Sequence, residues 1–185
     1  MIPVIFGRVM SPTRTLQRYA VPGFVVSLYH YLRNRAFISP SARVQLSSQI
    51  TFGPGTVVKA FAVVQSSGGR VAFGRNCALS GFGHISTGAG DVIIGDHVRI
   101  APNCTIVGGT KEIRRRDVLI VKQPEAEPRG VIIQDDVLIG AGSVILPGTH
   151  LRRGAVVGAG SVVQGEVEEY AVVAGAPARV VSHRE

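Results

Sequence analysis

The chain has 185 residues, of which 45% are hydrophobic, 23 are glycine and none is tryptophan. This length suffices for one domain with a substantial core, and many glycines with few large rings favour β structure built from small branched residues. The formal net charge of +8 indicates an anionic partner, such as phosphate or an acidic membrane surface. No zinc-finger, basic-zipper or interleaved aromatic and basic pattern accompanies this charge, so nucleic acid is not an expected partner.

Residues 1–37 are predicted to form an N-terminal helical cap or extension. Residues 1–6 are a short apolar start followed by arginines, which does not make a convincing cleavable signal. The longer apolar run, 19–32, is shorter than the about 20 residues that span a bilayer, and Pro22 interrupts it. Pro22 can instead begin a helix whose apolar residues recur at helical spacing, namely Val25, Leu28, Tyr29 and Leu32.

Two roles remain open for this helix. It can be a lid over the element that follows, or it can rest on an anionic membrane through residues 19–35, because arginines flank it. Both roles suit a cytoplasmic protein, and the second adds a peripheral contact with the inner face of the membrane.

A six-residue repeat fills most of the remaining chain. A bulky apolar residue recurs every six positions, often followed by glycine, and a period of six fits three short strands that close one triangular coil. Glycine, Asp or Asn then provides the positive φ that each corner demands. The pattern predicts a parallel β-helix over residues 38–185. Its repeat positions are Phe52, Val58, Val64, Phe73, Leu79, Ile85, Ile94, Ile100, Ile106, Ile133, Ile139, Ile145, Leu151, Val157 and Val163.

The spacing is interrupted at one corner only. The gaps from Val64 to Phe73 and from Ile85 to Ile94 are each nine residues, and the gap from Ile106 is 27. All three gaps follow the third repeat position of a coil, so the extra residues leave from the same corner. The longest gap predicts a protruding loop over residues 107–131.

The cysteines and histidines do not form a metal site in the sequence. Cys77 and Cys104 occur in similar settings, GRNCAL and APNCTI, without a CxxC motif, which indicates small buried thiols in a reducing compartment. The five histidines are dispersed, and no pair has ligand spacing on neighbouring coils. No metal cofactor is therefore expected.

The segments IGAGSV, VGAGSV and AVVAGAPARVV closely resemble the hexapeptide-repeat acyltransferases, and the resemblance covers about Ile38 to Val181. It implies a left-handed β-helix, a homotrimer, and transfer of an acetyl group from acetyl-CoA in clefts between adjacent subunits. The closing AGAPARVV and the loop after IAPNCTIV are most similar to the galactoside, xenobiotic and surface-polysaccharide O-acetyltransferases. The repeat alone is specific for the fold and not for the reaction.

The resemblance also implies a set of CoA contacts. Small corner residues would let the pantetheine arm of CoA pair with main-chain groups, and an arginine would hold a CoA phosphate through its fork of donors. The corner residues need their small size for the turn in any case. A lysine common in this branch is replaced by Gly165. The predicted CoA contacts are Ala141, Gly142, Ser143, Ala159, Gly160, Ser161 and Arg179.

The predicted catalytic base lies at a different position from the histidine of the related enzymes. Acetyl transfer needs a base to deprotonate the attacking group, and a neutral imidazole is the usual choice. The loop position where the related enzymes have a histidine is Lys111, and residues 104–138 contain no histidine. His84 immediately precedes Ile85, one coil from Ile106 at the edge where the loop departs. His84 is therefore the predicted base, and a structural or substrate-contacting role is the alternative.

The loop contains charged residues that can contact an acceptor. Lys111, Arg115 and Asp117 are the predicted substrate-binding residues, with anion binding as the expected role of the lysine. The run RRRD over residues 114–117 can equally be a solvated basic turn. The predicted function is acetyl-CoA-dependent O-acetylation of a sugar in bacterial surface polysaccharide or lipopolysaccharide synthesis. The alternatives are N-acetylation of an amino sugar and a β-helical scaffold without catalysis.

Overall fold

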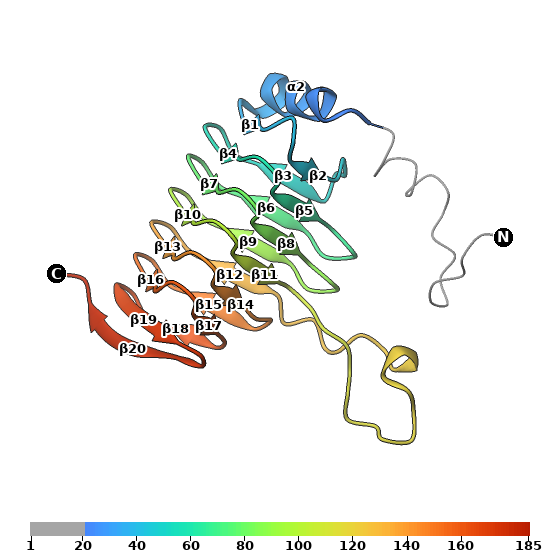
Figure 1. Cartoon of the computed structure of the whole chain (residues 1–185), viewed down its shortest axis with the longest axis vertical. Coiled ribbons are helices and arrows are strands. Elements are labelled where there is room, and N and C mark those ends of the chain that lie inside the picture. The colour runs from blue at the N-terminus through green and yellow to red at the C-terminus, as the bar shows by residue number, and fades with distance from the viewer. Residues whose placement is uncertain (1–20) are drawn as a thin grey trace.

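The computed structural model describes residues 21–185, so the first 20 residues of the predicted N-terminal extension lie outside the described part. The described chain forms a β-solenoid of about six turns with one helix, α2 (Gly23–Asn34), across its N-terminal end (Figure 1). This confirms the predicted fold class. No helix in residues 21–185 is long and apolar enough to cross a bilayer.

Three sheets of short strands form the walls of the solenoid, and all strand pairs except the last are parallel. Sheet A has β1 (Phe37–Ile38), β4 (Val57–Val58), β7 (Ala78–Leu79), β10 (Arg99–Ile100), β13 (Leu138–Ile139), β16 (Val156–Val157), β19 (Ala171–Gly175) and β20 (Ala178–His183). Sheet B has β2 (Arg43–Val44), β5 (Val63–Gln65), β8 (His84–Ser86), β11 (Thr105–Val107), β14 (Val144–Ile145) and β17 (Val162–Val163). Sheet C has β3 (Ile50–Phe52), β6 (Val71–Phe73), β9 (Val92–Ile94), β12 (Val131–Ile133), β15 (Thr149–Leu151) and β18 (Glu166–Val167).

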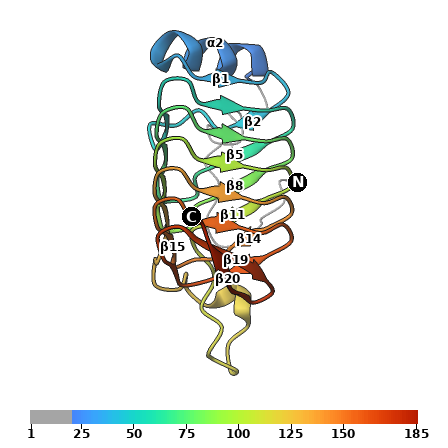
Figure 2. The same cartoon turned by 90° about the vertical axis from the view of Figure 1, so that its left-hand side faces the viewer.

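The coils stack one on another (Figure 2). The repeat positions form three columns inside the solenoid, one behind each sheet. Each of them is at most 5% exposed, and each pairs in register with the repeat position one coil away, as Ile85 does with Ile106. The stacking buries branched side chains from every coil against two neighbours, which stabilises the solenoid through apolar area removed from water. The columns also extend beyond the predicted positions, to Ile38 and Val44 at one end and to Val167 and Val173 at the other.

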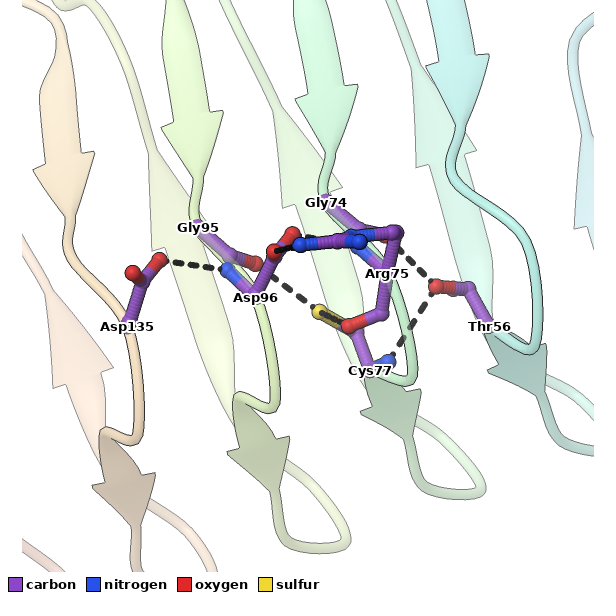
Figure 3. A network of polar contacts seen from close by, with 7 residues as sticks. All are labelled: Thr56, Gly74, Arg75, Cys77, Gly95, Asp96 and Asp135. Atoms are coloured by element: carbon purple, nitrogen blue, oxygen red, sulfur yellow. Dashed lines mark hydrogen bonds and ion pairs between the residues drawn. The ribbon is translucent and has the colours of Figure 1, made fainter.

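The corner between sheets C and A, called the C–A corner, is held by a polar network (Figure 3). The carboxylate of Asp96 accepts hydrogen bonds from the backbone N–H of Arg75 at 2.7 Å and from its guanidinium at 2.7 and 3.0 Å. Asp135 in turn accepts the N–H of Asp96 at 2.7 Å. Carboxylates that follow one another coil by coil therefore tie this corner together along the stack.

Both cysteines are buried free thiols, as predicted. Cys77 lies at the C–A corner, where its thiol donates to the carbonyl of Gly95 at 3.0 Å and its N–H donates to the hydroxyl of Thr56. Cys104 lies at the next corner, with its thiol 3.1 Å from the carbonyl of Gly140. Burial raises the pKa of both thiols, so both stay in the unreactive protonated form.

Helix α2 lies over the N-terminal end of the core. Val26 and His30 are buried, and the His30 ring packs edge-on against Phe52 with ring centroids 5.1 Å apart. Gly23 lies so close to Pro40 that a Cβ would meet the Pro40 carbonyl oxygen at 1.9 Å. The apolar residues that recur at helical spacing, Val25, Leu28, Tyr29 and Leu32, are exposed on the other side of the helix. The helix α2 is therefore apolar on both sides.

The other end of the solenoid and the loop complete the fold. Strand β20 folds back antiparallel on β19 and covers the last coil (Figure 1). The loop comprises residues 108–130, between the end of β11 and the start of β12, and contains a 3-10 helix at Ile120–Lys122.

Candidate functional site

The outer face of sheet B brings His84 close to the root of the loop. His84 begins β8 and is half-buried, while the next residue, Ile85, points into the core. In the adjoining strand β11, Thr105 is paired with His84 and Val107 with Ser86, and the loop leaves immediately after Val107. The register therefore puts His84 one coil and about two residues from the departure point of the loop.

His84 is oriented by Gln65, which lies one coil nearer the N-terminus. The side-chain amide nitrogen of Gln65 is 3.3 Å from Nε2 of His84. Nε2 of His84 accepts from this amide in the tautomer that has its ring proton on Nδ1, which is also the tautomer that a general base at Nε2 needs. A hydrogen bond of this length is weak, so an incoming acceptor group can take the place of Gln65 at Nε2.

A hollow of about 390 Å³ reaches Gln65. It lies between the start of α2 and the first two strands of sheet B, and its lining includes Gly23, Arg43, Gln45 and Gln65. His84 is not part of this lining, and Gln65 is the residue that connects the hollow with the imidazole. The hollow is large enough for part of a sugar-sized acceptor.

The corner between sheets A and B, called the A–B corner, presents a strip of small residues. Ala141, Gly142, Ala159 and Gly160 are exposed on two successive coils. Both glycines have a φ near +70°, and a Cβ added at either would meet nothing within 4 Å. Backbone geometry therefore fixes these glycines, while the space outside them is open.

The hydroxyls of the two serines of this corner have a packing role. Ser143 and Ser161 are fully buried, and both hydroxyls donate to the carbonyl of Gly158, at 3.0 and 2.7 Å. Main-chain groups of this corner also form hydrogen bonds between neighbouring coils. The Gly142 N–H donates to the carbonyl of Pro102, and the Gly160 N–H donates to the carbonyl of Ala141. An arm of CoA along this corner would find these two N–H groups already paired.

Arg179 lies at the C-terminal end of the same strip. The turn between β19 and β20 continues the A–B corner, because the Gly175 N–H donates to the Ser161 hydroxyl at 3.2 Å. Arg179 follows that turn, opposite Ala174, and is exposed. Gly165, where the resemblance leads one to expect a lysine, has a φ of +88° and open space around it.

The charged residues of the loop pair with one another. Lys111 forms an ion pair of 2.7 Å with Glu125 and an isolated antiparallel bridge with it. Arg115 forms an exposed ion pair of 2.5 Å with Asp117, and its hydrogen bond lowers the pKa of that carboxyl. The structure shows these contacts within the loop, and the assignment of the three residues to acceptor binding stays a prediction.

Gln123 organises the loop, although nothing in the sequence singles it out. It is 3% exposed, and its amide donates to the carbonyls of Arg115 and Val118 at 2.8 and 3.0 Å. The buried side chain therefore holds the basic run against the rest of the loop. The outside of the loop presents apolar side chains, namely Ile113, Leu119, Ile120 and Val121.

The comparisons with known proteins agree with this architecture. The family described as the hexapeptide repeat of succinyl-transferase matches residues 130–164. A 2,3,4,5-tetrahydropyridine-2,6-dicarboxylate N-acetyltransferase of Staphylococcus aureus is 52% identical over 62 residues, which are 34% of this chain and 25% of the relative. The matched segment thus spans about a quarter of that relative's length.

Two solved structures share the fold over most of the chain. AntD, an N-acyltransferase from Bacillus cereus in complex with dTDP and 3-hydroxybutyryl-CoA, has a TM-score of 0.71 at 20% identity, covering 82% of this chain and 81% of AntD. PerB from Caulobacter crescentus, in complex with CoA and GDP-perosamine, has a TM-score of 0.60 at 20% identity, covering 80% and 57%. The chain is thus a β-solenoid in which residues 130–164 match a hexapeptide-repeat family. These relatives do not single out an O-acetyltransferase branch.

Proposed function

We propose that the chain is an acyl-CoA-dependent acyltransferase that acts on the amine of a sugar nucleotide. The observation that supports this most strongly is the position of His84, on the wall that adjoins the open strip of the A–B corner and one coil from the loop. His84 directly follows residues 80–83 of the same corner, so base and strip lie along one edge. The relatives favour an amine over the hydroxyl acceptor that the sequence alone favours.

The geometry suggests how a donor would lie. Four coil spacings, about 19 Å in total, separate the turn next to Arg179 from the corner next to His84. A phosphate held by Arg179 at one end would leave the pantetheine arm to run over Ala159–Gly160 and Ala141–Gly142. The thioester would then lie near His84. Acetyl is the proposed acyl group.

The transfer itself needs one proton movement at His84. The amine nitrogen attacks the thioester carbonyl carbon, and the carbon–sulfur bond breaks to release CoA thiolate. Nε2 of His84 accepts the proton that the nitrogen loses, and the departing sulfur takes up a proton to become the free thiol. The products are the amide and CoA.

A homotrimer remains part of this proposal. Apolar residues on the outside of the loop, including Ile113, Leu119 and Ile120, are more than half exposed in the single chain. Such residues are typical of a surface that packs against another subunit. A loop from one copy would then close the space beside the A–B corner of the next.

The test is acyl transfer by His84→Ala, measured as release of free CoA thiol with nucleotide-linked amino sugars and matched hydroxyl sugars. We expect the rate to fall by at least about 10²-fold while CoA binding is retained. His97→Asn is the control, because His97 is an exposed corner residue with a φ of +61° that asparagine also tolerates.

Each outcome has a separate meaning. Turnover with hydroxyl sugars alone would mean that the acceptor group is a hydroxyl and not an amine. CoA binding without turnover of any acceptor would support the scaffold alternative. An unchanged rate in His84→Ala would show that the base lies elsewhere.

A further inference from the structure

The outward face of helix α2 is apolar and has no covering element in residues 21–185. Six large residues on α2 are between 38 and 73% exposed, namely Phe24, Val25, Leu28, Tyr29, Tyr31 and Leu32. At 100° per residue they fall on one side of the helix, opposite Val26 and His30, which pack on the first coil. The helix lies flat across the end of the solenoid, so this face points away from the molecule (Figure 1).

An exposed apolar helix face of this kind is expected to contact another surface. A surface helix on a globular domain normally has a polar side opposite its buried stripe, and a helix that is apolar all round is normally buried all round. Contiguous apolar patches of this kind mark contact sites. The closure of the core by Val26 and His30 accounts for one side of α2 only.

Positive charge is concentrated in the first half of the chain. Residues 1–90 contain nine of the 20 Lys and Arg residues and none of the 12 Asp and Glu residues, whereas residues 91–185 contain the other 11 basic residues and all 12 acidic ones. Six of the nine basic residues lie in residues 21–90, which form α2 and the coils next to it. Arg70 and Arg75 pair with Asp91 and Asp96, so four basic residues of this end, Arg33, Arg35, Arg43 and Lys59, are left without a carboxylate partner among the described ion pairs.

We propose that this end of the solenoid docks on the surface of an anionic lipid bilayer. The outward face of α2 enters the boundary between headgroups and acyl chains, and Arg33 and Arg35 at its C-terminal end contact acidic headgroups. Tyr29 and Tyr31 suit this depth, because a tyrosine ring has an apolar body and a polar tip. The positive charge argues against a second copy as the occupant, since pairing two such ends would bring like charges together.

Docking in this way would fix the orientation of the protein. Because α2 lies across the end of the stack, the solenoid axis would stand away from the membrane, with β20 at the far end (Figure 2). His84 and the hollow that reaches Gln65 would lie within a few coils of the bilayer. The proposal stands on α2 and the charge distribution, and does not depend on the acyl-transfer chemistry.

The experiment is co-sedimentation of the full chain with phosphatidylcholine vesicles, with and without phosphatidylglycerol. We expect binding to the anionic vesicles only, and weaker binding at high salt. Leu28→Gln with Leu32→Gln should weaken binding at least about tenfold, because it removes apolar area from the outward face and leaves Val26 and His30 in place. Arg33→Gln and Arg35→Gln should each weaken it roughly fivefold.

A matched control separates this face from exposed apolar surface in general. Val180→Gln with Val181→Gln changes two side chains of similar exposure on β20, at the far end of the solenoid, and should bind vesicles as the parent does. Thermal melting of each variant checks that it remains folded. The proposal would be overturned if the parent failed to bind anionic vesicles, or if the α2 double variant bound them as strongly as the parent does. A change in the oligomeric mass of the α2 double variant in solution would also overturn it.

Discussion

The A–B and C–A corners use the same turn but have different surroundings. Gly160 at the A–B corner and Gly154 at the C–A corner both have a φ of +69°. A Cβ on Gly160 would meet nothing within 4 Å, whereas a Cβ on Gly154 would meet the ring of Tyr170 at 2.4 Å. One corner is thus left open to solvent, and the other is filled by side chains of the same chain.

The difference shows which corner is available to a ligand. The polar side chains of the C–A corner form hydrogen bonds within the corner, as Arg75, Asp96 and Asp135 do. On the coils of residues 140–143 and 158–161 the A–B corner has alanine and glycine at the equivalent exposed positions, and its serines are turned inward. The small residues leave an open strip over these two coils, whereas Phe61 and Phe82 occupy the positive-φ position of the same corner nearer the N-terminus.

The strongest test of this contrast is to fill the open strip. Ala159→Phe puts a large side chain on an exposed residue whose φ is not positive, so the backbone can accept it. We expect the affinity for CoA to fall at least about 10²-fold, with a melting temperature within about 2 °C of the parent, because surface substitutions rarely affect stability. Calorimetric titration with CoA measures the first quantity and thermal melting the second.

Arg153→Phe is the matched control. Arg153 is exposed and precedes Gly154 at the C–A corner as Ala159 precedes Gly160 at the A–B corner. CoA affinity should be unchanged in this variant. If both variants lost affinity equally, or neither did, the A–B corner would not be the distinctive binding strip.

The periodic features of the structure could be predicted from the sequence, because stacking repeats the same environment in each coil. Ile85 and Ile106 follow the six-residue spacing, and both are fully buried. The contrast between the corners could not be predicted in this way. GAGS and RRGA both contain a glycine at the positive-φ position, and only the ring of Tyr170, from the next coil, distinguishes their surroundings.

The features that the sequence leaves open belong to elements whose surroundings are not periodic. Helical spacing identifies an apolar face on α2 but does not say which of two apolar sides packs on the core. The packing role of Ser143 and Ser161 also depends on a neighbouring coil, because their hydroxyls are buried on Gly158. Their main-chain contacts with CoA stay a prediction.

A second prediction compares the two glycines directly. Gly160→Ala should lower the melting temperature by about 2–4 °C, because a left-handed backbone strains any residue with a Cβ. Gly154→Ala has the same strain and in addition displaces the Tyr170 ring, so its melting temperature should be lower still. Equal melting temperatures for the two variants would contradict the difference in packing.

The smallest expected effect concerns the carboxylate of Asp96 at the C–A corner. Hydrogen bonds from Arg75 hold the pKa of Asp96 below its ordinary value of 3.8. The ionised form is therefore favoured in the folded state. Its contribution to stability is present above the ordinary pKa and is lost as the pH falls through the lowered one.

Asp96→Ala should accordingly lower the melting temperature at neutral pH by about 1–2 °C, less than Gly160→Ala, because the pair with Arg75 is partly solvated. The difference from the parent should shrink as the pH falls below 3.8. Glu168→Ala, at an exposed carboxyl of the same corner, should change the melting temperature less at either pH. A difference that stayed constant down to acid pH would mean that Asp96 acts through packing, and that the polar network does not distinguish the C–A corner from the A–B corner.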